Sequence, residues 1–262
     1  MANLNRRAGL HVAPITLALS LAACSAAQPV SGAATSGRPT GSITVLAASS
    51  LTNAFDTIDA TFQKAHPGAT VTVSYGASSA LATQIALGAP ADVFASASQT
   101  NMNAVTAAGA AATPTPFAKN VMEVVVPAGN PAHLTALADL ARPGVKVALC
   151  QAEVPCGATA AKVFTNAHLT VTPVTLEADV KSTLAKVTLG EVDAAVVYVT
   201  DVLAAGGKVT GIEIPADVNA STAYLIAVLK DSKNAALAQA YVAYILSAEG
   251  QKVLADAGFA AP

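Results

Sequence analysis

The sequence predicts an α/β fold with mostly parallel sheets flanked by helices, in a chain long enough for two lobes. Runs of β-branched residues alternate with stretches whose apolar residues recur at helical spacing, a pattern typical of parallel strands joined by helices. About 220 residues follow residue 41, which is enough for two lobes of about 100 residues each. Two predicted strands, at 121–126 and 224–229, lie far apart in the sequence, and each offers a path between lobes.

The N-terminal residues have the pattern of an export signal. Arg6 and Arg7 precede a mostly apolar stretch that is too short to span a bilayer, and small residues then lead to Cys24. We therefore predict a signal peptide over residues 1–23. The tetrapeptide Leu-Ala-Ala-Cys that ends at Cys24 resembles the bacterial lipobox, in which the cysteine becomes the N-terminus and carries lipid.

Residues 24–41 are then the lipid anchor and a flexible tether, because the segment is rich in Ser, Gly, Ala and Pro and has no apolar period. The alternative is an ordinary signal peptide in which Cys24 is incidental. Either signal places the protein outside the cytoplasm, and the lipid would hold it at the cell membrane.

Composition narrows the classes of function. The formal net charge is −2 and becomes more negative once Arg6 and Arg7 are removed, with no block of like charge. We therefore predict no nucleic-acid partner. Hydrophobic residues make up 53% of the chain and Trp is absent, so the core is built from small and aliphatic side chains.

The elements follow from the apolar pattern. A strand at 42–47 precedes a helix whose apolar stripe includes Phe55, Ile58 and Phe62. The later elements are a strand at 71–75, a helix carrying Leu81 and Ile85, strands at 92–95, 121–126 and 145–149, a helix after Cys156, a strand at 171–176, a helix from 179 to about 189, strands at 193–198 and 224–229, and two closing helices.

Four predicted strand-to-helix junctions carry small or hydroxyl residues. They are Ala48-Ser49-Ser50, Ala77-Ser78-Ser79, Val154-Pro155-Cys156-Gly157 and Glu177-Ala178-Asp179-Val180, and we expect no lysine or arginine near them. Junctions of this kind cluster at the carboxyl edge of a parallel sheet, where helix N-termini offer unpaired N–H donors. Together they predict an anion site without a cation. The alternative for Ser50 and for Ser78 is that each is only a helix N-cap.

Five segments resemble the molybdate-binding proteins of ABC importers. They are ITVLAASSLTNAF at 43–55, YGASSALATQIALGAPADVFASAS at 75–98, VPCGATAAKVF at 154–164, EADVKSTLAKVTLGEVDAAVVYVTD at 177–201 and YILSAEGQKVLADAGF at 244–259. They span nearly all of the chain after the tether. The resemblance implies a two-lobed periplasmic-binding-protein fold of type II with two hinge crossings, with residues 42–121 and 206–262 in lobe 1 and residues 122–205 in lobe 2.

The resemblance also implies a ligand set. The family's contacts fall on the hydroxyl and N–H of Ser50 and Ser78, the N–H of Cys156, the N–H of Val180 and the phenol of Tyr198. Ser49 adds a second hydroxyl beside Ser50, so the sequence leaves open which of the two faces the ligand. The implied function is capture of molybdate or tungstate and its delivery to an ABC permease and its ATPase, by a monomer without a cofactor.

The chemistry agrees with this set. A tetrahedral dianion only accepts hydrogen bonds, and the N–H and O–H groups of the predicted contacts can all donate to it. A protonated oxyanion such as hydrogen phosphate would bring a donor that finds no acceptor in the site, which would cost about 1 to 3 kcal/mol of binding free energy. Sulfate is also a full dianion, so a sulfate-binding protein of the same fold is the main alternative.

The sequence gives less support to an enzyme or to a metal-binding protein. A cysteine hydrolase would need Cys156 beside a histidine, and His133 and His168 are the nearest in sequence, both expected on helices. No G-x-S-x-G motif supports a serine hydrolase. Cys150 and Cys156 lack a second pair of metal ligands, so no metal site is predicted. Outside the cytoplasm these two cysteines are expected to form a disulfide, with two buried thiols as the alternative.

Overall fold

The computed structural model describes residues 38–262. Its strands are β1 (Gly41–Ala48), β2 (Ala69–Gly76), β3 (Val93–Ser96), β4 (Thr115–Pro127), β5 (Val147–Cys150), β6 (Thr175–Glu177), β7 (Ala194–Tyr198), β8 (Val209–Glu213) and β9 (Ser221–Val228). Its α-helices are α1 (Thr52–Ala65), α2 (Ser78–Ala86), α3 (Gln99–Ala107), α4 (Pro155–Asn166), α5 (Val180–Thr188), α6 (Val199–Ala205), α7 (Ala235–Leu246) and α8 (Ala248–Asp256). Short 3-10 helices are η1 (Ser49–Leu51), η2 (Leu137–Ala141) and η3 (Gly206–Lys208).

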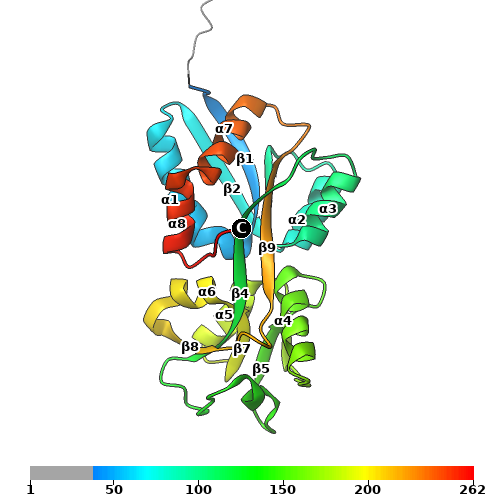
Figure 1. The fold of residues 1–262 in the computed structure, drawn as a ribbon, viewed down its shortest axis with the longest axis vertical. Coiled ribbons are helices and arrows are strands. Elements are labelled where there is room, and N and C mark those ends of the chain that lie inside the picture. The colour runs from blue at the N-terminus through cyan, green and yellow to red at the C-terminus, as the bar shows by residue number, and fades with distance from the viewer. Residues whose placement is uncertain (1–37) are drawn as a thin grey trace, which may run out of the picture. The chain divides into compact units, whose positions relative to one another are not determined.

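The first sheet has the order β2-β1-β3-β9-β4. β1 pairs in parallel with β2 and β3, and β9 joins antiparallel to β3 and to the first part of β4. Helices α1, α7 and α8 pack near one another beside this sheet, and α2 packs against α3 (Figure 1). The parallel strands end at one edge, so the residues after β1 and β2 meet there.

The second sheet is built on the end of β4. β7 and β8 pair antiparallel with β4 at 122–127, and β5 lies in parallel between β7 and β6. The resemblance implies a return to lobe 1 at residue 206, but β8 pairs with β4 in the second sheet. We therefore move the proposed boundary from residue 206 to the segment between β8 and β9.

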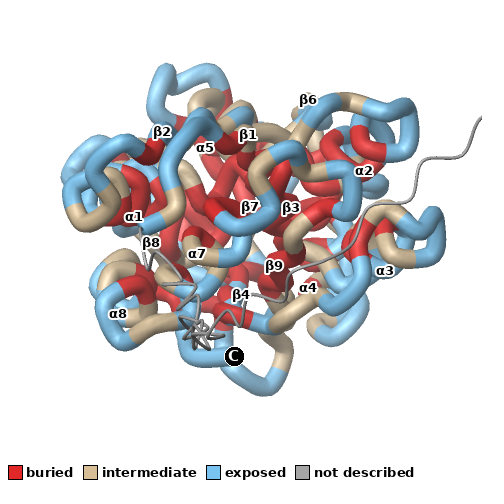
Figure 2. Tube along the Cα trace, turned by 90° about the horizontal axis from the view of Figure 1, so that it is seen from above, coloured by how far each residue is buried: buried red, intermediate tan, exposed pale blue. Residues whose placement is uncertain are grey.

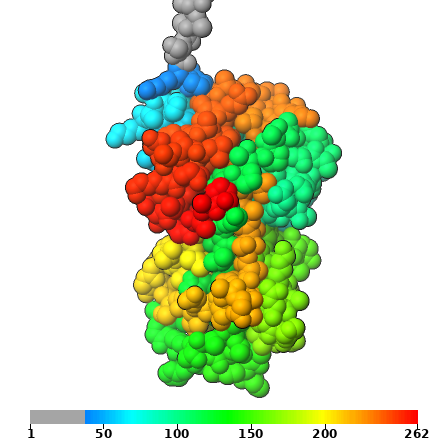
Figure 3. Space-filling model, viewed as in Figure 1, coloured from blue at the N-terminus to red at the C-terminus, as the bar shows by residue number. Residues whose placement is uncertain are grey.

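Strands β4 and β9 connect the two sheets, as expected for the two hinge crossings. β4 pairs with β9 up to Val121 and with β7 from Met122 onward. In the space-filling view the N-terminal and C-terminal colours gather on one lobe and the middle of the chain forms the other (Figure 3). The predicted two-lobed α/β fold is confirmed.

The central strands form the buried core, and the outer faces of the helices are exposed (Figure 2). Tyr224, Phe55 and Phe117 are fully buried on the first sheet, and Val124 and Val196 on the second. The spacing that predicted α1 is confirmed, because Phe55, Ile58 and Phe62 are all buried on one face. The core is mostly valine and alanine, as the composition indicated.

Some predicted elements need correction. The strand expected at 171–176 begins only at Thr175, and Pro173, which lacks an N–H donor, lies in the segment before it. Helices α3 and α6 were not among the predicted elements. The signal peptide, Cys24 and nearly all of the tether lie outside the described residues. Within residues 38–262 no helix is long and apolar enough to cross a membrane.

Asp59 is a buried carboxylate in α1 that accepts a hydrogen bond from the hydroxyl of Tyr241. Burial raises the pKa of Asp59 to about 6, the bond from Tyr241 opposes this rise, and the charge of Asp56 adds to it. A folded-state pKa above the unfolded value means that the folded state binds the proton more tightly. The contribution to stability is therefore full below about pH 4 and is lost as the pH rises through about 6.

Asp59→Asn should remove this pH dependence, because the amide cannot ionise and its oxygen can still accept from Tyr241. Relative to the parent, the variant should gain about 1 to 3 kcal/mol of stability between about pH 4 and about pH 8. Thermal unfolding across this range measures the difference. The exposed Asp256, replaced by Asn, is the control and should follow the parent, and parallel curves for Asp59→Asn and the parent would contradict the assignment.

Candidate functional site: a cavity between the two lobes

A small cavity lies where the four predicted junctions meet. Its volume is about 10 Å³, roughly the space that one water requires. It is lined by Ala48, Ser49, Ser50, Gly76, Ala77, Ser78, Ala97, Val154, Pro155, Cys156, Asp179, Val180 and Tyr198. The lining comes from both lobes. The residues after β1 and β2 line the side that belongs to lobe 1, and the starts of α4 and α5 and the end of β7 line the side that belongs to lobe 2.

All predicted ligand contacts line this one cavity, although the sequence spreads them over about 150 positions. Ser50 and Ser78 come from lobe 1, and Cys156, Val180 and Tyr198 come from lobe 2. Ser49 also lines the cavity and, like Ser50, is buried. Which of the two serines would face a ligand therefore stays open, and the binding role of the whole set stays a prediction.

The two serines are not helix N-caps, so that alternative is wrong. Ala48 precedes η1 and Ala77 precedes α2, and neither cap position makes a side-chain bond. The Ser78 Oγ instead accepts a 2.9 Å hydrogen bond from the N–H of Ala97. The Ser50 Oγ lies 2.8 Å from the hydroxyl of Tyr224. Each serine oxygen is thus held by the protein while its own proton can still turn elsewhere.

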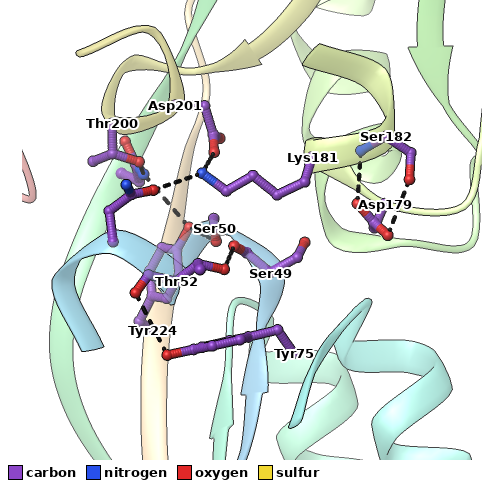
Figure 4. Close-up of polar contacts among 12 residues, drawn as sticks. Ser49, Ser50, Thr52, Tyr75, Asp179, Lys181, Ser182, Thr200, Asp201 and Tyr224 are labelled. Carbon is purple, nitrogen blue, oxygen red and sulfur yellow. Dashed lines mark hydrogen bonds and ion pairs between the residues drawn. The ribbon is translucent and has the colours of Figure 1, made fainter. Parts of the chain in front are cut away.

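Helices α4 and α5 begin at the cavity with unpaired main-chain donors. Cys156 is the second residue of α4, and a residue there has no acceptor in its own helix. In α5 the N-cap carboxylate of Asp179 accepts from the N–H of Ser182 at 2.9 Å, which leaves the N–H of Val180 free of that cap. The carboxylate is also bonded to the Ser182 hydroxyl (Figure 4). The acidic group in the lining is therefore already engaged.

The phenol of Tyr198 is a buried donor without a partner. Tyr198 is 1% exposed, and its hydroxyl forms no hydrogen bond within residues 38–262. The nearby hydroxyl of Thr159 donates to the carbonyl oxygen of Pro155, and its effect on the pKa of Tyr198 opposes the effect of burial. Burial raises the pKa of Tyr198 well above its usual value, so the phenol stays protonated. A buried donor without an acceptor costs folding energy, and its presence in a cavity lining points to a ligand that accepts.

Cys150 and Cys156 form a disulfide with Cα atoms 5.8 Å apart, which confirms the predicted pairing. Cys156 is therefore no free nucleophile, and the thiol-hydrolase alternative is wrong. His133 and His168 are not on helices, contrary to expectation, since both adopt left-handed backbone conformations at φ of 51° and 50° in loops. The bridge closes the loop between β5 and α4, and so holds the start of α4 beside the sheet edge.

The expectation that no lysine lies near the junctions is wrong, because Lys181 directly follows Val180. Its ammonium group does not reach the cavity lining, however. It lies 3.0 Å from the carboxylate of Asp201 and donates at 3.0 Å to the side chain of Asn53 (Figure 4). Asp201 is fully buried, and burial raises its pKa to about 6 despite the opposing effect of Lys181. The cation is thus neutralised within the protein, by contacts that span both lobes.

Three buried residues behind the cavity were not found by sequence reasoning. Asn120 on β4 donates to the hydroxyl of Thr200 at 2.8 Å and to that of Tyr224 at 3.5 Å, and Tyr224 in turn contacts Ser50. These contacts join residues up to 174 positions apart. Nothing in the local pattern marks them, since each reads as an ordinary strand or helix residue.

Chemically, the cavity offers donors and almost no acceptors. Serine hydroxyls, helix N-terminal residues and one phenol line the same small volume. Groups of this kind stabilise a small anion by charge-assisted hydrogen bonds and by the partial positive charge of helix N-termini. We find no group of three or more His, Cys, Asp or Glu side chains that could hold a metal ion in the described residues.

The chain is similar to known bacterial solute-binding proteins. Residues 43–260 match the family described as "Bacterial extracellular solute-binding protein". The molybdate-binding protein ModA of Mycobacterium tuberculosis is 41% identical over 94% of this chain and 95% of its own. The periplasmic molybdate-binding protein of Azotobacter vinelandii has a TM-score of 0.73 at 20% identity, over 84% of this chain and 99% of its own. The sulfate-binding protein SubI of M. tuberculosis also has a TM-score of 0.73, at 21% identity, over 83% and 86%.

A two-lobed fold with a donor-lined cavity between the lobes defines a solute-binding protein. The chain belongs to the bacterial extracellular solute-binding protein family, and within it the chain is related to the ModA proteins. It is accordingly a binding protein and not an enzyme. The structural neighbours below 25% identity establish the fold alone, because they include proteins for more than one oxyanion.

Proposed function

We propose that this protein captures molybdate and tungstate in the cavity between its lobes and delivers them to the permease and ATPase of an ABC importer. The proposed contacts are Ser50, Ser78, Cys156, Val180 and Tyr198, with Ser49 as an additional one. The observation that carries the proposal is the convergence of donors on one cavity, including a buried phenol that forms no hydrogen bond within the described residues.

The size of the cavity supports a small inorganic anion. At a volume of about 10 Å³, even a tetrahedral oxyanion would require the lobes to move apart slightly, and a sugar or an organic acid would require a wider opening. Closure around the ligand would then bring donors from both lobes to the same oxygen atoms. Delivery to a permease would require the reverse opening.

The donor set supports a dianion over a protonated anion. The oxygen atoms of Ser50 and Ser78 already face protein donors, and the Asp179 carboxylate is capped within its own helix. A proton on the ligand would therefore have to compete with protein donors for these oxygen atoms, which disfavours hydrogen phosphate. Sulfate remains the alternative, because it is also a dianion and a sulfate-binding protein shares the fold. Kinship with ModA at 41% identity favours molybdate.

The proposal also covers the location, the oligomeric state and the lobe boundaries of the protein. We propose that it acts as a monomer outside the cytoplasm and is held at the membrane by lipid on Cys24. Lobe 1 would comprise residues 42–121 and the C-terminal part from β9 onward, and lobe 2 the residues between.

A melting-temperature series with the purified protein tests the ligand. Molybdate and tungstate at 100 times the dissociation constant should each add about 2.7 kcal/mol of stability, because they bind only the folded state. Sulfate, phosphate and citrate at the same concentration should cause no comparable shift. A shift with sulfate equal to that with molybdate would refute the assignment, and no shift with any oxyanion would refute the site itself.

A further inference from the structure

The hydroxyl of Ser50 is held from behind by a chain of buried groups. Tyr224 is 0% exposed and Asn120 is 2% exposed, and neither lines the cavity. Their contacts run from Asn120 through Tyr224 to Ser50 (Figure 4 shows the tyrosine end). The direction in which protons point along this chain decides whether Ser50 offers the ligand a donor or an acceptor.

The orientation of the Asn120 amide fixes the direction of its hydrogen bond with Tyr224. Its Oδ1 accepts from the N–H of Val121 at 3.0 Å, so the Nδ2 group must be the side that faces Thr200 and Tyr224. A flipped amide would set two donors against each other at Val121. Asn120 therefore donates to the Tyr224 oxygen and has no lone pair there to accept from it.

The phenol proton of Tyr224 then has one remaining direction. Among the described residues its oxygen contacts Asn120 and Ser50, and Asn120 does not accept, so Tyr224 donates to the Ser50 Oγ at 2.8 Å. Burial raises the pKa of Tyr224, which keeps the proton on the phenol. Since the Ser50 oxygen accepts this proton, its own proton is available to the cavity.

Aromatic packing holds the phenol in this place. The Tyr224 ring meets the rings of Phe117, Tyr198 and Phe259 edge-on, with centroids 6.1, 6.3 and 5.2 Å away. A ring enclosed on three sides cannot swing its hydroxyl away from Ser50 without disturbing the core. The contact is thus a stable part of the fold.

We propose that Tyr224, oriented by Asn120, is a positioning residue that sets anion selectivity by holding Ser50 as a donor. This inference rests on the proposed function. Ser78 has the equivalent arrangement by another route, because the N–H of Ala97 occupies its oxygen. Without Tyr224 the Ser50 hydroxyl would rotate freely, and its lone pair could accept a proton from a protonated anion such as hydrogen phosphate.

A double-mutant cycle in isothermal titration calorimetry tests the inference, with molybdate and inorganic phosphate as probes. Tyr224→Phe should weaken molybdate binding about 5- to 30-fold and Ser50→Ala about 10- to 150-fold. The double variant should bind no more than about twofold more weakly than Ser50→Ala, because Tyr224 acts through that hydroxyl. The ratio of molybdate to phosphate affinity should fall at least about tenfold in Tyr224→Phe.

Tyr241→Phe is the matched control, since it removes another buried phenol that is bonded to Asp59 in lobe 1. It should alter the melting temperature and leave the affinity ratio unchanged. The inference would be overturned if the losses of affinity in the double variant multiplied, or if Tyr224→Phe left the ratio of molybdate to phosphate affinity unchanged. The proposed function would still stand in that case, provided that the parent protein binds molybdate. A parent that binds no molybdate would overturn both. If Tyr224→Phe does not fold, Asn120→Ala takes its place in the same cycle.

Discussion

Gly157→Ala should weaken molybdate binding by about 100-fold or more and destabilise the fold by about 1 to 3 kcal/mol. A Cβ at Gly157 would lie 1.9 Å from the carbonyl oxygen of Gln151 and 2.8 Å from that of Cys150. Both neighbours are backbone atoms, so no side chain can turn aside. The first turn of α4 would have to move, and with it the N–H of Cys156 that we place on the anion.

The clash follows from the disulfide loop. The bridge from Cys150 to Cys156 folds residues 150–156 back over the start of α4, with Cα atoms 5.8 Å apart. The carbonyl groups of that loop then pack on the one position of the turn that lacks a side chain. Gly157 has no positive φ, so its requirement is space and not backbone freedom.

Calorimetry with molybdate and thermal unfolding measure the two effects of Gly157→Ala. Gly207→Ala is the matched control, because Gly207 has no atom within 4 Å of a new Cβ and no positive φ. It should bind and unfold like the parent. If Gly157→Ala remains folded by circular dichroism and keeps parental affinity, the N–H of Cys156 is not a ligand contact.

The sequence predicted the elements that carry the cavity because their signals are local. The Ser49-Ser50 and Ser78-Ser79 pairs follow β-branched strands and precede apolar stripes, so each could be placed at the start of a helical segment. Parallel sheet geometry then brings such junctions to one edge. The disulfide could also be predicted, because Cys150 and Cys156 are close in sequence and lie between a strand and a helix.

The second layer of the site could not be predicted in this way. Lys181 follows Val180, a proposed ligand contact, yet its contact with Asn53 spans 128 residues, and its partner Asp201 lies in α6, a helix that was not predicted. The bond between Asn120 and Thr200 spans 80 residues. Such pairs depend on how the lobes are placed, and no local periodicity encodes that placement.

Tyr198→Phe should have effects of opposite sign on stability and on binding. The buried phenol has no partner within residues 38–262, so removing it relieves a desolvation cost of about 1 to 3 kcal/mol in the unliganded protein. The same change removes one hydrogen bond to a charged ligand, worth about 1.5 to 3 kcal/mol, or roughly 10- to 150-fold in molybdate affinity. The variant should therefore melt higher than the parent without ligand and gain less from molybdate.

Ser78→Ala is the control that separates a ligand donor from a structural one. Its oxygen accepts from the buried N–H of Ala97, so the variant leaves that donor unpaired and should lose both stability and affinity. Melting curves of both variants, with and without molybdate, distinguish the two patterns. A Tyr198→Phe protein that melts lower than the parent without ligand, or binds molybdate as tightly, would show that the phenol has a structural partner. Its place in the cavity lining would then be a matter of packing alone, and the donor set would end with the serines and the two helix N-termini.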